Sequence, residues 1–159
     1  MMKIIISILL SFLTLNMSAK NKNEYRYEVI PIAVGTEGTA LIKVYSYAKS
    51  QKKAIDLGKR NAVHALLFKG IPGGNGVYYT PPLVKPGEHE LYVKFFDNFF
   101  ESGDYLRFVT LSSDGIVDPE DMLRVGSEYK IGIVFAVSKN ELRKYLEDNG
   151  IIKKLGDMF

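Results

Sequence analysis

The stretch from Thr39 to Gly70 changes from the hydrophobic period of a strand to that of a helix. Residues 39–48 alternate between a small apolar face and a more polar face, which predicts a β-strand. Ser50 stands where a helix N-cap is expected, and Gly70 stands where the chain would leave that helix. The apolar stripe between them consists of Ala54, Ile55, Gly58, Ala62, Ala65, Leu66 and Phe68. Because so much of the stripe is Ala or Gly, we expect this helix to approach a sheet closely and cover it.

Further strands are predicted at residues 25–34, 105–111 and 129–137. Pro31 cannot donate a ladder hydrogen bond, so it places the first strand at an edge or a bulge, whereas the nearly continuous apolar run 129–137 predicts a central strand. Helices are predicted at 88–101, at 139–147 and, in a short form, at 118–125. We therefore predict an α+β domain with an antiparallel or mixed four-stranded sheet and helices packed mainly on one face.

The predicted helix 88–101 carries four phenylalanines on one stripe, at positions 95, 96, 99 and 100. Such stripes usually fill the core, and docking on another subunit is the alternative. The stretch from Ile71 to Gly87 is rich in glycine and proline and predicts a long loop, which is typical of a functional or a disordered segment. Its Gly-Gly-Asn-Gly run follows a helix rather than a strand, which argues against a phosphate-binding loop.

Tyr78 and Tyr79 lie in this loop beside prolines. Two interpretations remain open for them. They cover the domain's own core, which is the commoner fate of aromatic residues, or they offer a flat contact surface to a protein partner or a sugar.

Residues 1–19 have the pattern of a signal peptide, with Lys3 before an apolar run and a small-residue cleavage position at Ala19. The run is too short to span a bilayer. A buried N-terminal strand or helix is the alternative. The sequence thus predicts a single domain at 20–159 in the periplasm or outside the cell. Because the chain has no cysteine, it has no disulfide and no acylated cysteine anchor.

The formal charge is only +3 and the cations are dispersed, so we expect no nucleic-acid partner. Lys52, Lys59 and Arg60 nevertheless fall on the predicted helix 51–69 and suggest a basic contact surface for an anionic envelope polymer or for lipid head groups. A simply solvated helix face is the alternative.

The sequence contains only two histidines and offers little catalytic chemistry. We expect His64 on a solvated helix flank and His89 on the surface at a helix start. The residue four positions after His89 is Val93, so the two-histidine zinc spacing fails. A turn and a helix cap account for a local cluster of acids, which comprises Asp114, Asp118, Glu120 and Asp121. No catalytic residue, metal or cofactor is predicted.

Residues 44–67, VYSYAKSQKKAIDLGKRNAVHALL, resemble a segment shared by the amino-terminal domains of periplasmic flagellar-ring proteins and related small outer-membrane lipoproteins. In those proteins a strand leads into an alanine-rich helix on an antiparallel sheet. The resemblance implies an envelope protein that assembles with others and catalyses nothing. The chain departs from both groups in its Gly/Pro loop and phenylalanine helix, and from the lipoproteins in lacking cysteine.

Together these features predict a non-enzymatic exported binding or assembly module of the bacterial cell envelope, with an envelope protein or a second copy as partner. One alternative is a small extracytoplasmic hydrolase, in which Asp97, Glu101 or Asp104 faces a histidine near the Gly/Pro loop. The other alternative is a carbohydrate-binding module that uses Tyr78 and Tyr79.

Overall fold

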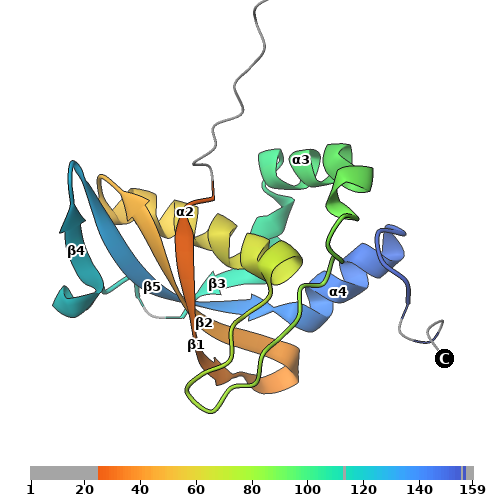
Figure 1. Cartoon of the computed structure of the whole chain (residues 1–159), viewed down its shortest axis with the longest axis horizontal. Helices are drawn as coiled ribbons and strands as arrows, with labels where there is room; N and C mark the ends of the chain where they lie inside the picture. Colours follow the sequence, from red (N-terminus) through yellow and green to blue (C-terminus); the bar gives the residue numbers. More distant parts are fainter. Residues whose placement is uncertain (1–24, 113, 155, 157–159) are drawn as a thin grey trace, which may run out of the picture.

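A computed structural model gives the placement of residues 25–112, 114–154 and 156. These residues form a curled antiparallel sheet with three α-helices (Figure 1), which confirms the predicted α+β class. The predicted signal peptide lies outside the described residues. No helix in the described part of the chain has the length and apolar character needed to cross a bilayer.

The elements have the following bounds. The strands are β1 (Tyr27–Val34), β2 (Thr39–Ala48), β3 (Val109–Leu111), β4 (Met122–Val125) and β5 (Glu128–Ser138). The α-helices are α2 (Gln51–His64), α3 (Val93–Glu101) and α4 (Lys139–Asp148). The 3-10 turns are η1 (Thr36–Gly38), η3 (His89–Tyr92), η4 (Asp104–Phe108) and η5 (Pro119–Asp121), and η2 (Ala65–Lys69) is a π turn that extends α2.

The long strand β5 is the centre of the sheet, as its apolar run predicted. β2 pairs with one edge of β5 along its whole length, and β3 and β4 share the other edge. Every pairing is antiparallel, so the mixed sheet that the sequence also allowed does not occur. β1 is the outer strand beside β2, with an irregular register between Pro31 and Ala33, which confirms the edge position expected from the proline.

Helix α2 packs against β2 and β5 at close range. Its Ser50 N-cap accepts a hydrogen bond from the backbone of Lys53, as predicted. Gly58 faces the ring of Phe135 on β5, and a Cβ at this glycine would lie 2.6 Å from two ring carbons. The alanines of the same stripe, Ala54, Ala62 and Ala65, are fully buried. The small residues therefore allow the close approach that the sequence indicated.

The phenylalanine stripe of α3 fills the core between α3, η4 and α4. Phe96, Phe99 and Phe100 are buried, and the ring centroid of Phe99 lies 5.6 Å from that of Tyr145 on α4. This confirms the core interpretation of the stripe. The same hydrophobic core contains Leu142 and Leu146 of α4 and the inward face of the sheet.

Three predicted elements differ from the structure. Residues 118–125 were expected to form a helix, but only the 3-10 turn η5 is helical and Met122–Val125 pair with β5 instead. Gly126, at φ +62°, reverses the chain there, and Asp118 makes no side-chain capping bond. Within 105–111 only the last three residues form a strand. Helix 88–101 begins with the 3-10 turn η3.

The contact between Gly58 and Phe135 gives a first prediction. Gly58→Ala should lower the free energy of unfolding by about 1–3 kcal/mol through overpacking, although alanine has the better helix propensity. In a Phe135→Leu background the same change should cost much less, because the ring is gone. Denaturant midpoints of the four proteins in this double-mutant cycle measure the coupling. Equal costs in the two backgrounds would contradict the contact.

Candidate functional site

The Gly/Pro loop between α2 and η3 is an ordered hairpin. Ile71 and Thr80 exchange two backbone hydrogen bonds of 2.8 and 3.0 Å, and Gly74 and Val77 exchange two of 2.9 and 2.8 Å. At its tip Asn75 and Gly76 both have positive φ, of 51° and 76°, which is the geometry of a type I′ turn. The long loop expected from composition is therefore a paired structure.

The hairpin (residues 71–80) and the segment that follows it (residues 81–84, called the return strand below) are held against the rest of the domain by hydrogen bonds. The side-chain amide of Asn75 donates to the carbonyl of Pro31 on β1 at 2.8 Å. Leu83 and Val84 donate their backbone N–H groups to the carbonyls of Leu66 and Leu67 in η2, both at 3.0 Å. The carbonyls at the end of a helix lack partners within the helix, so the loop satisfies them. The loop is thus held at its tip and along its return strand.

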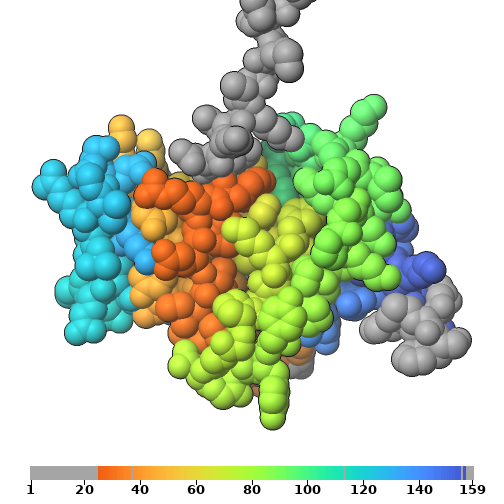
Figure 2. Space-filling view, viewed as in Figure 1, coloured from red at the N-terminus to blue at the C-terminus, as the bar shows by residue number. Residues whose placement is uncertain are grey.

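Tyr78 and Tyr79 do not cover the core, so the interpretation that they do is wrong. Tyr78 is 90% exposed and Tyr79 is 61% exposed. The hairpin stands out beside β1 as a projecting tip (Figure 2). The hydroxyl of Tyr79 lies back against Gly70, within 3.1 Å of where a Cβ would be. Tyr78 is the more projecting of the two rings.

Both histidines of the chain line one cleft of about 220 Å³ beneath the return strand of the loop. The cleft lies between the end of α2, the π turn and η3. It is lined by His64, Phe68, Val84, Lys85, Pro86, Gly87 and His89. The hairpin tip and this cleft belong to the same loop, which descends from α2 to the tip and returns to η3 (Figure 1).

His64 is enclosed by aromatic rings rather than solvated, which corrects the sequence prediction. It stacks on Tyr25 with a centroid distance of 3.6 Å, and its Nδ1 lies 2.8 Å from the hydroxyl of Tyr27. Burial, and after it electrostatic repulsion from Lys69 and Arg60, lowers the pKa of His64 to about 3. The ring is therefore neutral. We assign the tautomer with the proton on Nε2, in which Nδ1 accepts the hydrogen of the Tyr27 hydroxyl, because burial raises the pKa of that phenol and keeps it protonated.

Two cations stand behind His64. Lys69 places its Nζ 3.8 Å from the ring centroid of Tyr27, and burial lowers the pKa of its ammonium group. The guanidinium of Arg60 lies over Tyr25, with 5.0 Å between Cζ and the centroid, and donates to the Tyr25 hydroxyl at 3.0 Å. Both cations lie close enough to His64 to lower its pKa.

The predicted basic surface of α2 is therefore divided. Arg60 folds onto Tyr25, whereas Lys52 is exposed and Lys59 is partly exposed. Lys52 lies at the start of α2, the end away from the hairpin (Figure 1). The structure thus brings Arg60 to the rear of the histidine cleft, and it does not gather Lys52 with Tyr78 and Tyr79.

The acid and histidine pairing expected of a hydrolase does not form in this cleft. Asp97 and Glu101 are exposed on α3, Asp104 is half-buried at η4, and none of the three lines the cleft. In the described part of the chain no three His, Asp or Glu side chains converge as a metal site would require. The histidine cleft combines two imidazoles and an ammonium group with apolar walls.

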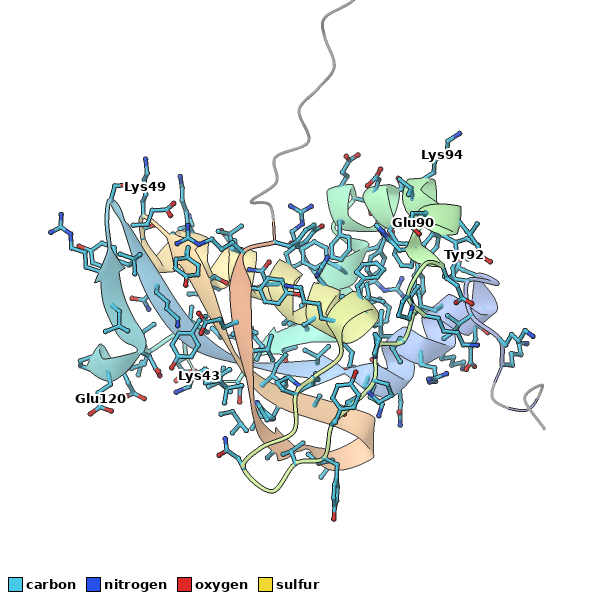
Figure 3. All side chains as sticks on the ribbon, in the orientation of Figure 1. Lys43, Lys49, Glu90, Tyr92, Lys94 and Glu120 are labelled. Atoms are coloured by element: carbon cyan, nitrogen blue, oxygen red, sulfur yellow. The ribbon has the colours of Figure 1, made fainter. Side chains whose placement is uncertain are left out.

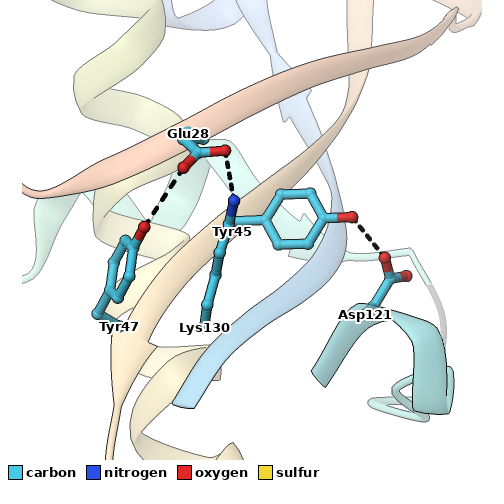
Figure 4. Close-up of polar contacts among 5 residues, drawn as sticks. All are labelled: Glu28, Tyr45, Tyr47, Asp121 and Lys130. Atoms are coloured by element: carbon cyan, nitrogen blue, oxygen red, sulfur yellow. Dashed lines mark hydrogen bonds and ion pairs between the residues drawn. The ribbon is translucent and has the colours of Figure 1, made fainter. Parts of the chain in front are cut away.

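The outward face of the sheet has a different electrostatic character, because its charges are paired (Figure 4). Asp121 accepts hydrogen bonds from Lys43 at 2.6 Å and Tyr45 at 2.5 Å, and Glu28 accepts one from Lys130 at 2.6 Å. Burial acts to raise the pKa of Asp121, but the hydrogen bonds from Lys43 and Tyr45 outweigh it and lower the pKa. The bond to Asp121 raises the pKa of the Tyr45 phenol to about 12.

Asp121 therefore links η5 to β2 through its side chain, whereas the sequence suggested only a role in a turn or helix cap. Its charge is neutralised by Lys43, and the pair ties η5, the turn that precedes β4, to β2. Charged side chains such as Lys49 and Lys94 project from the surface elsewhere (Figure 3).

No protein-family model matches the chain, and no curated protein or solved structure matches it. The resemblance drawn from residues 44–67 stays a prediction. The histidine cleft was not predicted because its parts come from α2, the π turn η2, the loop and η3. The hairpin did have a sequence signal, since Asn75-Gly76 between apolar residues is typical of a type I′ turn.

His64 gives the second prediction. Its folded pKa lies below the usual value of about 6.5, so stability that depends on neutral His64 should be lost progressively as the pH falls from about 6.5 towards 3. In NMR spectra of the ring nitrogens, folded His64 should keep the Nε2–H tautomer from pH 8 to pH 5. Tyr27→Phe should remove this preference and cost about 0.5–1.5 kcal/mol. A folded His64 that titrates near pH 6.5 would contradict its burial.

Proposed function

We propose that this protein is a non-catalytic binding module of the bacterial cell envelope and that Tyr78 is its main contact with a protein partner. The observation that carries the proposal is a tyrosine ring 90% exposed on a hairpin whose backbone is paired and fastened to the domain. A tyrosine has few rotatable bonds, so a ring presented in this way loses little entropy when a partner covers it. Tyrosine is also enriched among the residues that dominate binding energy.

The surface beside Tyr78 supports this role. The hairpin and the end of β1 enclose a mainly apolar cavity of about 100 Å³, whose lining includes Val34, Val77 and Thr80. Val77 directly precedes Tyr78, and Val34 is itself 74% exposed. An apolar hollow in the same hairpin offers a place for an anchoring side chain from a partner.

Export and the envelope enter the proposal from the sequence. The pattern of residues 1–19 and the resemblance of residues 44–67 to envelope domains both support them. The absence of a carboxylate from the histidine cleft, among the described residues, supports a non-catalytic role. A protein partner is favoured over a sugar because Tyr79 lies back against Gly70, which leaves one projecting ring instead of a paired platform.

Site-specific photo-cross-linking in the native cell tests this proposal. A photoreactive phenylalanine analogue at Tyr78 should give a discrete protein adduct, and the same analogue at Leu91 should not. Leu91 is a matched control because it is 75% exposed but lies on η3. Tyr78→Ala should weaken co-purification of the adduct partner at least tenfold without changing the melting temperature. Equal labelling from positions 78 and 91, or none from 78, would contradict the proposal.

Export is tested separately by the mass of the protein purified from its native cell. The mature chain should begin near Lys20, because cleavage is expected after Ala19. Intact Met1 on cytoplasmic protein would contradict the envelope assignment while leaving the contact through Tyr78 untouched.

A further inference from the structure

We propose that the histidine cleft is a second binding site, which takes a small anion with a flat apolar body, such as an aromatic carboxylate. The cleft has a volume of about 220 Å³, lies at the η3 end of the loop and shares no lining residue with the hairpin tip. The inference is therefore independent of the role given to Tyr78.

Three side chains of the cleft can donate hydrogen bonds to a ligand, those of His64, Lys85 and His89. His64 has its Nδ1 engaged by Tyr27, so Nε2–H is the donor that its ring has left. Lys85 adds an ammonium group, and His89 adds a second imidazole. In the described part of the chain no carboxylate lines the cleft, although Glu88 and Glu90 flank His89 in sequence. The complementary ligand group therefore supplies acceptors and negative charge.

The rest of the lining is apolar and selects the body of the ligand. Phe68 lies between the two histidines, with centroid distances of 5.0 Å to His64 and 4.5 Å to His89. Val84 and Pro86 form the opposing wall. A strongly hydrated ion such as phosphate would lose water against these groups without compensation, whereas a flat apolar ring would be stabilised by them.

The site is already formed without a ligand. Tyr25 supports the far side of His64 at 3.6 Å, and Tyr27 fixes the tautomer. The return strand of the loop is held by the backbone bonds of Leu83 and Val84 to η2. Because His64 stays neutral, the charge that attracts the ligand comes from Lys85 and, behind the ring, from Lys69 and Arg60. Little reorganisation is needed on binding.

The test is a titration of the folded protein with benzoate, benzamide and inorganic phosphate, followed by NMR of the two histidine rings. Benzoate should shift both rings saturably, and benzamide and phosphate should each bind at least tenfold more weakly. Lys85→Gln should weaken benzoate at least fivefold and leave benzamide unchanged. Lys144→Gln, at an exposed position of α4, is the control for a lost surface charge and should change nothing.

Phe68→Leu provides a second variant that tests the apolar part of the site. It should weaken benzoate and benzamide alike, while Tyr78→Ala should affect neither. Benzamide or phosphate binding as tightly as benzoate would overturn the proposed ligand class. Shifts that fail to saturate, or that appear outside the two histidine rings and their neighbours, would overturn the site itself.

Discussion

The close contact between Gly58 of α2 and Phe135 of β5 is the constraint on which the rest of the structure depends. Because the helix has no side chain at this point, its axis lies near the sheet and the stripe on either side of Gly58 is buried. This position brings the end of α2 over the first residues of β1, where Tyr25 and Tyr27 enclose His64. It also places the π turn where its carbonyls receive the return strand of the loop.

Two groups of polar side chains in this domain have different roles, one in stabilising the sheet and one in forming the histidine cleft. On the outward face of the sheet Asp121 pairs with Lys43 and Glu28 pairs with Lys130, so each of these two carboxylates has a cationic partner. Near His64 stand the cations Lys69 and Arg60, and the imidazole is neutral because burial, and after it these cations, lowers its pKa. The first group stabilises the sheet, and the second is able to bind.

Local patterns predicted much of this fold. The alternation of β2, the small-residue stripe of α2, the edge position of Pro31 and the central strand β5 all depend on residues close in sequence. The prediction of a helix at 118–125 was wrong because Met122–Val125 pair with β5. The hydrogen bonds and packing gained in the sheet outweigh the local preference for a helix.

The candidate site was less accessible to sequence reasoning. The loop was recognisable from its composition, but the environment of His64 depends on Tyr27, which lies 37 residues earlier in the chain. Helical periodicity placed His64 on a flank of α2, and nothing in that periodicity shows that β1 would cover the flank. The exposure of Tyr78 likewise depends on how the hairpin sits on the domain, since Ile71 of the same hairpin is buried in the core.

We infer that the Gly/Pro loop is a rigid platform and not a mobile connection. Amide hydrogen exchange of the folded protein measures this directly, because exchange of a bonded amide requires local opening. In a rigid loop, exchange should be far slower than in an unstructured chain for five bonded amides, those of Ile71, Val77, Thr80, Leu83 and Val84. Exchange of these five amides at the unstructured rate, while those of β2 and β5 remain protected, would contradict it.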